Sequence, residues 1–194
     1  MLAAFLDACV LYPPDYRDLL LRLAQAGAFQ PLWSPEVQRE WMQNLLLKRT
    51  DLTKERLEYT RQQMNRAFPH ACVNGYEHIV DEVYGLPDQN DRHVVAAAHV
   101  GGAEYIVTEN IKDFPSEALE RFELEALRLE VFLMLLVELD IRSNGVPLTI
   151  GKGLAALRRG MRNPRKTQEE LIAHWHERGL HDFAKFAVAY KEMW

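Results

Sequence analysis

The chain is poor in cysteine, because Cys9 and Cys72 are the two thiols among its 194 residues. Two thiols can build neither a disulfide framework nor a zinc site with four cysteine ligands. Disulfide-rich domains and four-cysteine zinc domains are therefore excluded. Long hydrophobic runs are lacking too. The longest, VFLMLLVEL at residues 131–139, is far shorter than the ~20 residues that cross a membrane, and we expect no membrane span.

The first residues of the sequence are not typical of an export signal. The first residues, MLAAFLDACVLYPP, carry no basic residue ahead of the apolar run, and Asp7 interrupts that run where an export signal would stay apolar. We therefore expect a cytoplasmic protein whose thiols are reduced. The remaining composition, with 48% hydrophobic and 26% charged residues, is ordinary for a globular protein and argues against disorder.

Acidic and basic residues are unevenly distributed along the chain. The net charge is −5, but residues 1–130 carry 21 acidic and 13 basic residues, whereas residues 131–194 carry 7 and 10. An acidic body is therefore followed by a mildly basic tail. The tail contains the basic stretch RRGMRNPRK at residues 158–166, which could meet the phosphates of a nucleic acid or form a solvated surface. Composition alone favours the solvated surface.

Short apolar segments alternate with helical patterns over the first two thirds of the chain. AAFLDACVLY, residues 3–12, is typical of a buried strand that Pro13 and Pro14 stop, and further short strands are expected at PLWS, EYIVT and LEALRLE. Helices are expected at about residues 15–28, 35–49, 53–68 and 90–100. This order predicts an α/β sandwich around a central, mainly parallel sheet.

From about residue 130 onward the pattern is helical only. VFLMLLVEL, GKGLAALRRGM, TQEELIAHWHERG and HDFAKFAVAYKEM each show apolar residues at helical spacing, with turn-forming residues between them. We therefore expect two parts, an α/β domain over residues 1–129 and a helical extension over residues 130–194.

Four acidic residues stand where a parallel sheet places its ligand sites, near strand ends and helix starts. Asp7 lies inside the first expected strand, Glu40 in the helix after PLWS, Asp91 at a helix start, and Asp113 after the strand YIVT. A carboxylate buried in an apolar strand is costly unless it is paired or bound to a metal. Four converging carboxylates would repel one another unless a hard divalent cation lay between them, which indicates Mg²⁺ or Mn²⁺.

Each of these polar residues also has a structural interpretation, as a helix cap, a turn former, a solvated side chain or an ordinary strand residue. Such interpretations apply to Asp88, Asp91, Asn110, Asp113, Glu40 and Thr108. His93 is more readily explained as a structural hydrogen-bond donor than as a ligand. Taken singly these residues are weak indicators of a site, and their order and spacing are more specific.

Four motifs follow one another within about residues 4–130: FLDACVLYP, VQREW, LPDQNDRHVVAAA and IVTENIKDFP. Their order resembles that of the PIN-domain nucleases, which include the VapC-like toxins of toxin–antitoxin pairs. The resemblance implies a PIN-like three-layer sandwich for residues 1–129, and metal binding and catalysis by Asp7, Glu40, Asp91 and Asp113. It implies a metal-dependent endoribonuclease, in which water activated by Mg²⁺ or Mn²⁺ hydrolyses an RNA phosphodiester bond.

The resemblance also implies accessory roles for three polar residues. Asp88 and Asn110 would be polar groups near the metal, and Thr108 would orient the site through its hydroxyl. Asp91 would both cap its helix and bind the metal. Cys9 departs from the family, since many relatives have a small hydroxyl residue or Asn there, and this departure alters how water is held but removes no carboxylate.

An acidic pocket attracts RNA only with the help of nearby cations. The residues expected to hold the RNA backbone are Arg92, Lys112, Arg158, Arg159, Arg162 and Lys166. We expect the basic stretch at residues 158–166 to hold RNA backbone or an acidic partner beside the metal cleft. The expected partners are an RNA substrate, a small antitoxin protein and a second copy of the chain, with no membrane partner.

Other functional classes stay open at this point. A haloacid-type phosphatase needs a second Asp two residues after the first, where Cys9 stands, and a receiver domain needs an acid pair that the sequence lacks. Two alternatives keep the PIN-like fold. One is a catalytically inactive module that binds RNA or a protein, and the other is a housekeeping RNA-processing nuclease.

Overall fold

The computed structural model describes residues 1–161 and 165–194. These residues group into two compact units, which we call the sheet unit and the helical unit. The sheet unit comprises Leu2–Tyr16 and Gln30–Arg128. The helical unit comprises Met1, Arg17–Phe29 and Leu129–Trp194. Residues 17–29, which follow the first strand closely in the sequence, thus group with the C-terminal helices. The domain boundary expected between residues 129 and 130 stays a prediction.

Four short parallel strands form one sheet in the order β2-β1-β3-β4. Leu6 at the end of β1 lies opposite Val107 of β3, and Val107 lies opposite Leu127 of β4. The chain moves outward from β1 to β2 on one side and from β3 to β4 on the other. The β1/β3 pair is therefore a topological switch point, where open α/β sheets bind ligands beyond the carboxyl ends of their strands.

The elements of the sheet unit confirm the expected α/β class with a central parallel sheet. Its strands are β1 (Ala3–Leu6), β2 (Gln30–Leu32), β3 (Tyr105–Val107) and β4 (Glu125–Leu127). Its α-helices are α1 (Ala8–Leu11), α3 (Pro35–Lys48), α4 (Lys54–Ala67), α5 (Glu77–Val80), α6 (Arg92–Val100) and α7 (Ser116–Leu119). Its 3₁₀ turns are η1 (Gln89–Asp91), η2 (Ile111–Asp113) and η3 (Glu120–Phe122).

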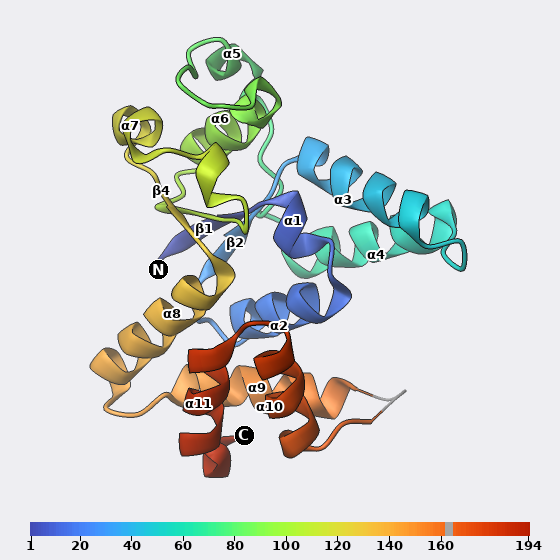
Figure 1. Cartoon of the computed structure of the whole chain (residues 1–194), viewed down its shortest axis with the longest axis vertical. Helices are drawn as coiled ribbons and strands as arrows, with labels where there is room; N and C mark the ends of the chain where they lie inside the picture. The colour runs from blue at the N-terminus through green and yellow to red at the C-terminus, as the bar shows by residue number, and fades with distance from the viewer. Residues whose placement is uncertain (162–164) are drawn as a thin grey trace. The chain divides into compact units, whose positions relative to one another are not determined.

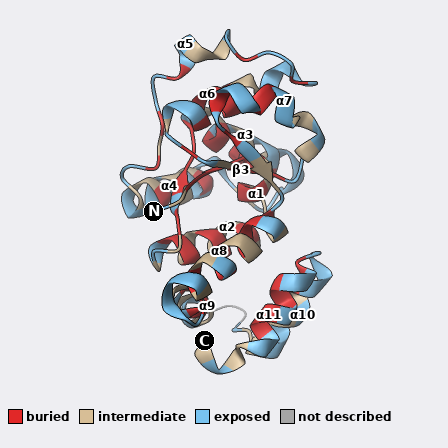
Figure 2. Ribbon diagram, turned by 90° about the vertical axis from the view of Figure 1, so that its left-hand side faces the viewer, coloured by how far each residue is buried: buried red, intermediate tan, exposed pale blue. Residues whose placement is uncertain are grey.

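The core of the sheet unit is built on β1 and α6. Ala4, Phe5 and Leu6 of β1 have no exposed surface, as expected for an inner strand covered on both faces. Helix α6 packs against β1 and β3 (Figure 1), and its alanines at positions 96 to 98 are fully buried. Figure 2 shows buried residues along both α6 and β3. Because alanine is small, the helix backbone comes close to the sheet, and this fixes the first turn of α6 near the strand ends.

The strand expected over residues 3–12 is shorter than predicted. Strand β1 ends at Leu6, so Asp7 follows the strand instead of lying inside it, and the next four residues form α1. The backbone of Asp7 is extended and its side chain accepts a hydrogen bond from the N–H of Ala8, which starts the helix. An apolar run this short has no periodicity that separates a strand from a buried helix, which is why the sequence pattern was misleading.

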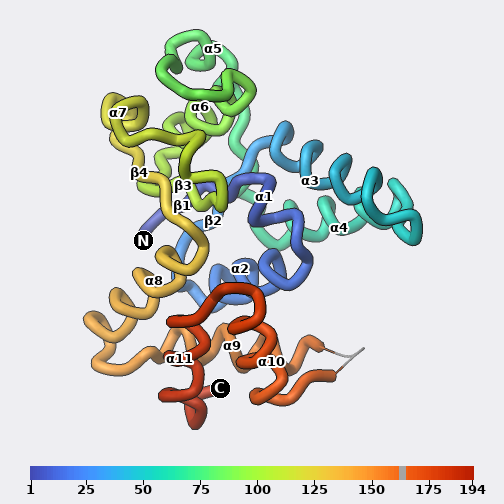
Figure 3. The backbone as a smooth tube through the Cα atoms, in the orientation of Figure 1, coloured from blue at the N-terminus to red at the C-terminus, as the bar shows by residue number. Residues whose placement is uncertain are grey.

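Helices alone form the described part of the helical unit, as expected, and Figure 3 traces their path. They are α2 (Pro14–Gln25, with Arg17 onward in this unit), α8 (Leu129–Asn144), α9 (Leu148–Gly160), α10 (Gln168–Glu177), α11 (His181–Ala189) and the 3₁₀ turn η4 (Lys191–Met193). Aromatic side chains fill its core, with Phe29 edge-on to Phe132 and Trp175 packed against Phe183. No helix in the described part of the chain combines the length and the apolar composition needed to cross a membrane.

Candidate functional site

The carboxyl ends of β1 and β3 carry two buried polar residues. Asp7 follows β1 and Thr108 follows β3, and the backbone N–H of Asp7 donates to the carbonyl of Val107 over 3.1 Å. The exposed fractions are 6% for Asp7 and 0% for Thr108. A carboxylate and a hydroxyl group are thus buried together at the switch point of the sheet.

Three donors hold the side chain of Asp7. Its Oδ2 accepts from the hydroxyl of Thr108 over 2.7 Å and from the thiol of Cys9 over 3.1 Å, and its Oδ1 accepts from the N–H of Ala8 over 2.6 Å. The hydroxyl of Thr108 also accepts from the N–H of Asn110 over 3.0 Å. These contacts fix the orientation of Asp7 and use three of the about four lone-pair sites of its carboxylate, so one site stays available for a cation.

Cys9 is a hydrogen-bonding residue here and not a nucleophile. Burial and the neighbouring charge of Asp7 raise the pKa of the Cys9 thiol to about 12, so the thiol is protonated at neutral pH. Its Sγ also lies 3.3 Å from the hydroxyl of Thr108 and accepts from the N–H of Glu109 over 3.2 Å. The residue that departs from the family pattern therefore belongs to the network around Asp7.

Asp91 occupies the N-cap position of α6, but its side chain makes no capping hydrogen bond, so the expectation that it caps the helix is wrong. Asp88 provides the cap one turn earlier, because its backbone is extended and its Oδ1 accepts from the N–H of Asn90 over 2.8 Å. The 3₁₀ turn η1 between them leaves Asp91 with helical backbone angles, which do not suit an N-cap. Its carboxyl group is thus free of a capping role.

Burial and three neighbouring carboxylates raise the pKa of Asp91 from its ordinary value of 3.8 to about 6. Those neighbours are Asp7, Asp88 and Asp113, in decreasing order of effect. A charge that raises a pKa in this way must lie near the group that titrates. The charges of Asp7, Asp88 and Asp113 therefore all disfavour the ionised form of Asp91.

Asp113 ends the 3₁₀ turn η2 directly after β3 and is half-buried. Its backbone N–H donates to the carbonyl of Asn110 over 2.9 Å, so the turn that the sequence allows at this point is present. The side chain of Asn110 does not cap this turn. Asn110 is joined to the site by its backbone, through the contact with the hydroxyl of Thr108.

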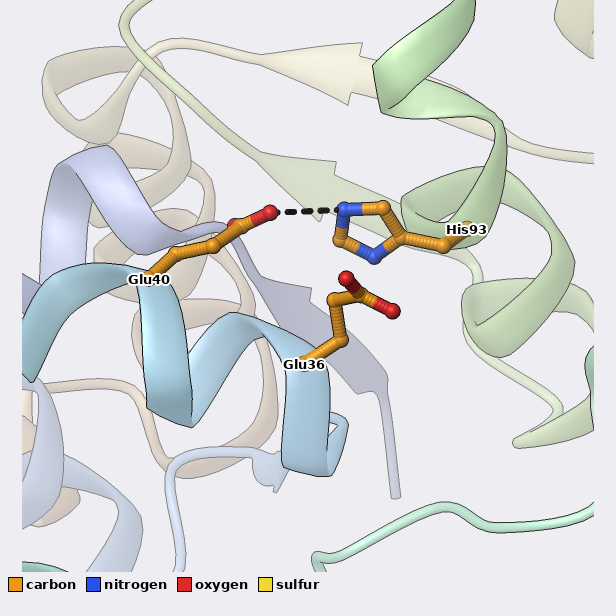
Figure 4. Close-up of side chains that lie close together, drawn as sticks. All are labelled: Glu36, Glu40 and His93. Atoms are coloured by element: carbon orange, nitrogen blue, oxygen red, sulfur yellow. Dashed lines mark hydrogen bonds and ion pairs between the residues drawn. The ribbon is translucent and has the colours of Figure 1, made fainter. Parts of the chain in front are cut away.

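Glu40 approaches α6 from α3. Its Oε1 lies 2.9 Å from Nε2 of His93, which is 9% exposed (Figure 4). Burial alone would lower the pKa of His93, but the hydrogen bond and charge of Glu40, with further contributions from Glu36 and Asp7, raise it above its usual value. The expectation that His93 is a structural hydrogen-bonding residue agrees with this contact, and its partner is one of the expected metal ligands.

The structure adds one acidic residue that sequence reasoning missed. Ligand atoms of Glu36, Glu40 and His93 all lie within 4.8 Å of one another. Glu36 and Glu40 are four residues apart on α3 and therefore share one face of the helix, which is the sequence signal that could have identified Glu36. Among the residues that the structure describes, no set of three drawn from the expected acids is as tight, and their joint binding of one metal stays a prediction.

The residues expected to contact RNA fall in both units. Arg92, half-buried, and Lys112, exposed, belong to the sheet unit, next to Asp91 and Asp113 in sequence. In the helical unit a cavity of about 430 Å³ is lined by Arg158, Arg159 and Lys166, together with Arg165, which was not singled out beforehand. Arg162 lies outside the described residues.

Comparisons with known proteins identify the family of the chain. Residues 3–112, more than half of the 194-residue chain, match the family described as "PIN domain". A 44-residue segment is 50% identical to "Putative ribonuclease VapC50" of Mycobacterium tuberculosis (strain ATCC 25618 / H37Rv), which covers 23% of this chain and 26% of that protein. The match thus spans about a quarter of that relative, and no solved structure matches the chain. The chain belongs to the PIN-domain family.

Proposed function

We propose that the chain is a metal-dependent endoribonuclease that hydrolyses RNA phosphodiester bonds. The observation that carries the proposal is the buried carboxylate of Asp7 at the switch point of the sheet, whose charge, with those of Asp88 and Asp113, raises the pKa of Asp91. Membership of the PIN-domain family and the partial identity to a protein named as a ribonuclease support the same activity. Catalytic and metal-binding roles are proposed for Asp7, Glu40, Asp91 and Asp113.

The acidic residues fit a hard divalent cation such as Mg²⁺ or Mn²⁺. Without a cation, ionising Asp91 beside Asp7 and Asp113 is unfavourable, as its raised pKa indicates. Carboxylate oxygens are the preferred ligands of these ions, and half-buried side chains can still reach them. When bound, the ion would activate water and neutralise the negative charge that develops on the phosphate.

The residues of the chain orient the site and bind the substrate. Thr108 and Cys9 hold the carboxylate of Asp7, and His93 holds that of Glu40. Asp88 caps the 3₁₀ turn η1, and this turn ends at Asp91, directly before α6. Arg92 and Lys112 are proposed to attract the RNA backbone toward the acidic residues.

We propose further that the nuclease is the toxin of a toxin–antitoxin pair, acting in the cytoplasm. The support is the name of the relative that shares a quarter of its length with this chain. A small antitoxin protein would then be its partner, and a second copy of the chain is a further candidate. Arrest of growth on expressing this chain alone, relieved by the product of a neighbouring gene, would separate a toxin from a housekeeping RNA-processing nuclease.

The activity is tested with the purified chain and a mixed-sequence RNA in the presence of Mg²⁺ or Mn²⁺. We expect cleavage that EDTA abolishes and that added metal restores. Asp91→Asn should lose cleavage while keeping the fold, because it removes one of the repelling carboxylates and no capping contact. If the wild-type chain binds RNA but cleaves none under any metal condition, the protein is an inactive binding module. Cleavage that persists in EDTA would refute the metal mechanism.

A further inference from the structure

His93 presents two different nitrogen atoms to two carboxylates on α3. Its Nε2 lies 2.9 Å from Glu40, and Figure 4 shows the carboxylate of Glu36 on the side of the ring that carries Nδ1. All three side chains bring a ligand atom within 4.8 Å of the others. The imidazole of His93, from the first turn of α6, thus lies beside two acidic groups that both come from α3.

The Nδ1 atom of His93 is buried and has no hydrogen-bond partner among the residues that the structure describes. His93 as a whole is more than nine-tenths buried, with an exposed fraction of 9%. A buried polar atom without a partner is costly and rare in native proteins. In the neutral imidazole the hydrogen lies on Nε2, because the carboxylate of Glu40 can only accept it. The lone pair then lies on Nδ1, which is the atom left without a partner.

We propose that Nδ1 of His93 and the carboxylate of Glu36 bind a divalent cation, with Glu40 orienting the imidazole through Nε2. A histidine that ligates a metal almost always donates its other ring N–H to a carboxylate or carbonyl, which is the contact that Glu40 makes. Metal–ligand bonds of about 2.1 Å place two ligands of one ion up to about 4.2 Å apart. Figure 4 shows the carboxylate of Glu36 beside Nδ1, and the partly exposed side chain of Glu36 can move to bring an oxygen within this distance.

The ligand chemistry selects the ion. A set of one imidazole nitrogen and carboxylate oxygens suits Mn²⁺ or a later transition metal better than Mg²⁺, which prefers oxygen alone. Arg39 forms an ion pair with Oε1 of Glu36 over 2.6 Å, so the other oxygen of Glu36 is the one proposed to ligate. Glu40 would be shared, because its Oε1 contacts His93 while its other oxygen serves the proposed nuclease site. Because Glu40 belongs to both sites, this inference rests on the proposed function.

The test uses Mn²⁺ as the probe and detects a nitrogen ligand by its magnetic coupling to the ion. Electron spin echo envelope modulation of the Mn²⁺-loaded chain should show coupling to a ¹⁴N nucleus from an imidazole. His93→Gln should abolish that coupling, and Glu36→Gln should weaken Mn²⁺ binding by about tenfold or more. The matched control is His99→Gln, which removes an exposed histidine on the same helix and should leave the coupling unchanged.

Two results would overturn the inference. One is bound Mn²⁺ without ¹⁴N coupling in the wild-type chain, which would make His93 only a positioning residue for Glu40. The other is coupling that survives in His93→Gln. Should His93→Gln fail to fold, the wild-type spectrum and the Mn²⁺ affinity of Glu36→Gln decide the question. RNA cleavage is measured separately, so nitrogen coupling without cleavage would refute the proposed function alone, and cleavage without coupling would refute this inference alone.

Discussion

Each unit of the molecule buries one aspartate, and the two differ in what surrounds them. Asp7 of the sheet unit is 6% exposed and Asp140 of the helical unit is 7% exposed. Asp140 accepts from the side chain of Asn144 over 2.7 Å and from the N–H of Ile150 over 2.8 Å, which ties the end of α8 to the start of α9. Asp7 accepts three hydrogen bonds, and its charge also raises the pKa of Asp91 and Cys9. Burial of a carboxylate is therefore not by itself a sign of a site, whereas coupling to other titratable groups is.

The largest expected effect is on RNA cleavage, which should depend on Asp7 and not on Asp140. Asp7→Asn should reduce RNA cleavage by on the order of 10²–10³-fold or more, because a charged ligand is lost from the site. Asp140→Asn should leave cleavage per folded molecule within about twofold, but it should lower the free energy of unfolding by about 1–3 kcal/mol, because one buried donor loses its acceptor. Single-turnover cleavage and urea denaturation of both variants measure the two quantities.

The two aspartates would have the same role if both variants changed cleavage and stability alike. A large loss of cleavage in folded Asp140→Asn would mean that the helical unit takes part in catalysis. Wild-type cleavage by Asp7→Asn in Mg²⁺ or Mn²⁺ would remove Asp7 from the metal site.

The next effect concerns the hydroxyl that holds Asp7. Thr108→Val keeps the shape of the side chain but removes the donor to Oδ2 of Asp7 and the acceptor of the N–H of Asn110. Loss of such a supporting contact should reduce metal affinity or cleavage by about 10–100-fold. Thr108→Ser keeps the hydroxyl and should stay within about threefold of the wild type. Calorimetric titration with Mn²⁺ and cleavage assays make the comparison, and equal behaviour of the Val and Ser variants would assign Thr108 to packing alone.

Most of the fold could be predicted from the sequence because its signals are local. Alternating apolar segments and helical periodicities predicted the parallel sheet. The helices expected at about residues 35–49 and 53–68 are α3 and α4, and the side chains of Ser34 and Thr53 accept their capping hydrogen bonds. The end of β1 could not be predicted in the same way. Residues 8–11 are apolar in either a strand or a buried helix, and only the contact of Asp7 with Ala8 decides between them.

The candidate site was less predictable, because its contacts join residues that are far apart in the chain. The order of the acidic residues predicted that Asp7, Asp91 and Asp113 share one site, and this stays a prediction, with the charges of Asp7 and Asp113 raising the pKa of Asp91. The sequence left both Asp88 and Asp91 as cap candidates, and nothing local showed that η1 would give the role to Asp88 alone, or that Glu36 would lie beside His93. Such pairings depend on how α3 and α6 pack on the sheet, which one sequence does not reveal.

A further prediction concerns pH in the absence of metal. The pKa of Asp91 in the folded chain, about 6, lies above its ordinary value of 3.8, so the folded state binds this proton more tightly than the unfolded state does. The stability that this group contributes is fully present below about pH 4 and is lost as the pH rises through about 6. The pKa of His93 is also raised, so the stability that His93 contributes is likewise lost as the pH rises.

The metal-free wild type should therefore lose stability between about pH 4 and pH 6 relative to Asp91→Asn, whose amide does not titrate. Added Mn²⁺ should raise the melting temperature of the wild type by a few degrees at pH 7.5 and by less at pH 5, because protons compete with the metal. Differential scanning fluorimetry at a series of pH values measures both effects. Parallel stability curves for the wild type and Asp91→Asn would contradict the raised pKa.

The smallest expected effect sharpens the contrast between the acidic sheet unit and the basic segment of the helical unit. Arg158, Arg159 and Lys166 line one cavity, and neutralising them together with Arg162 should weaken binding of single-stranded RNA. Each lost phosphate contact should reduce the salt slope of the binding constant by ~0.7, whereas Mn²⁺ affinity should not change, because none of these residues is an expected ligand. A control variant neutralises three cations elsewhere on the helical unit, Arg142, Lys152 and Lys185, and should keep the wild-type slope. If both variants bind RNA with the same affinity and salt slope as the wild type, the basic segment serves a protein partner or is a solvated surface.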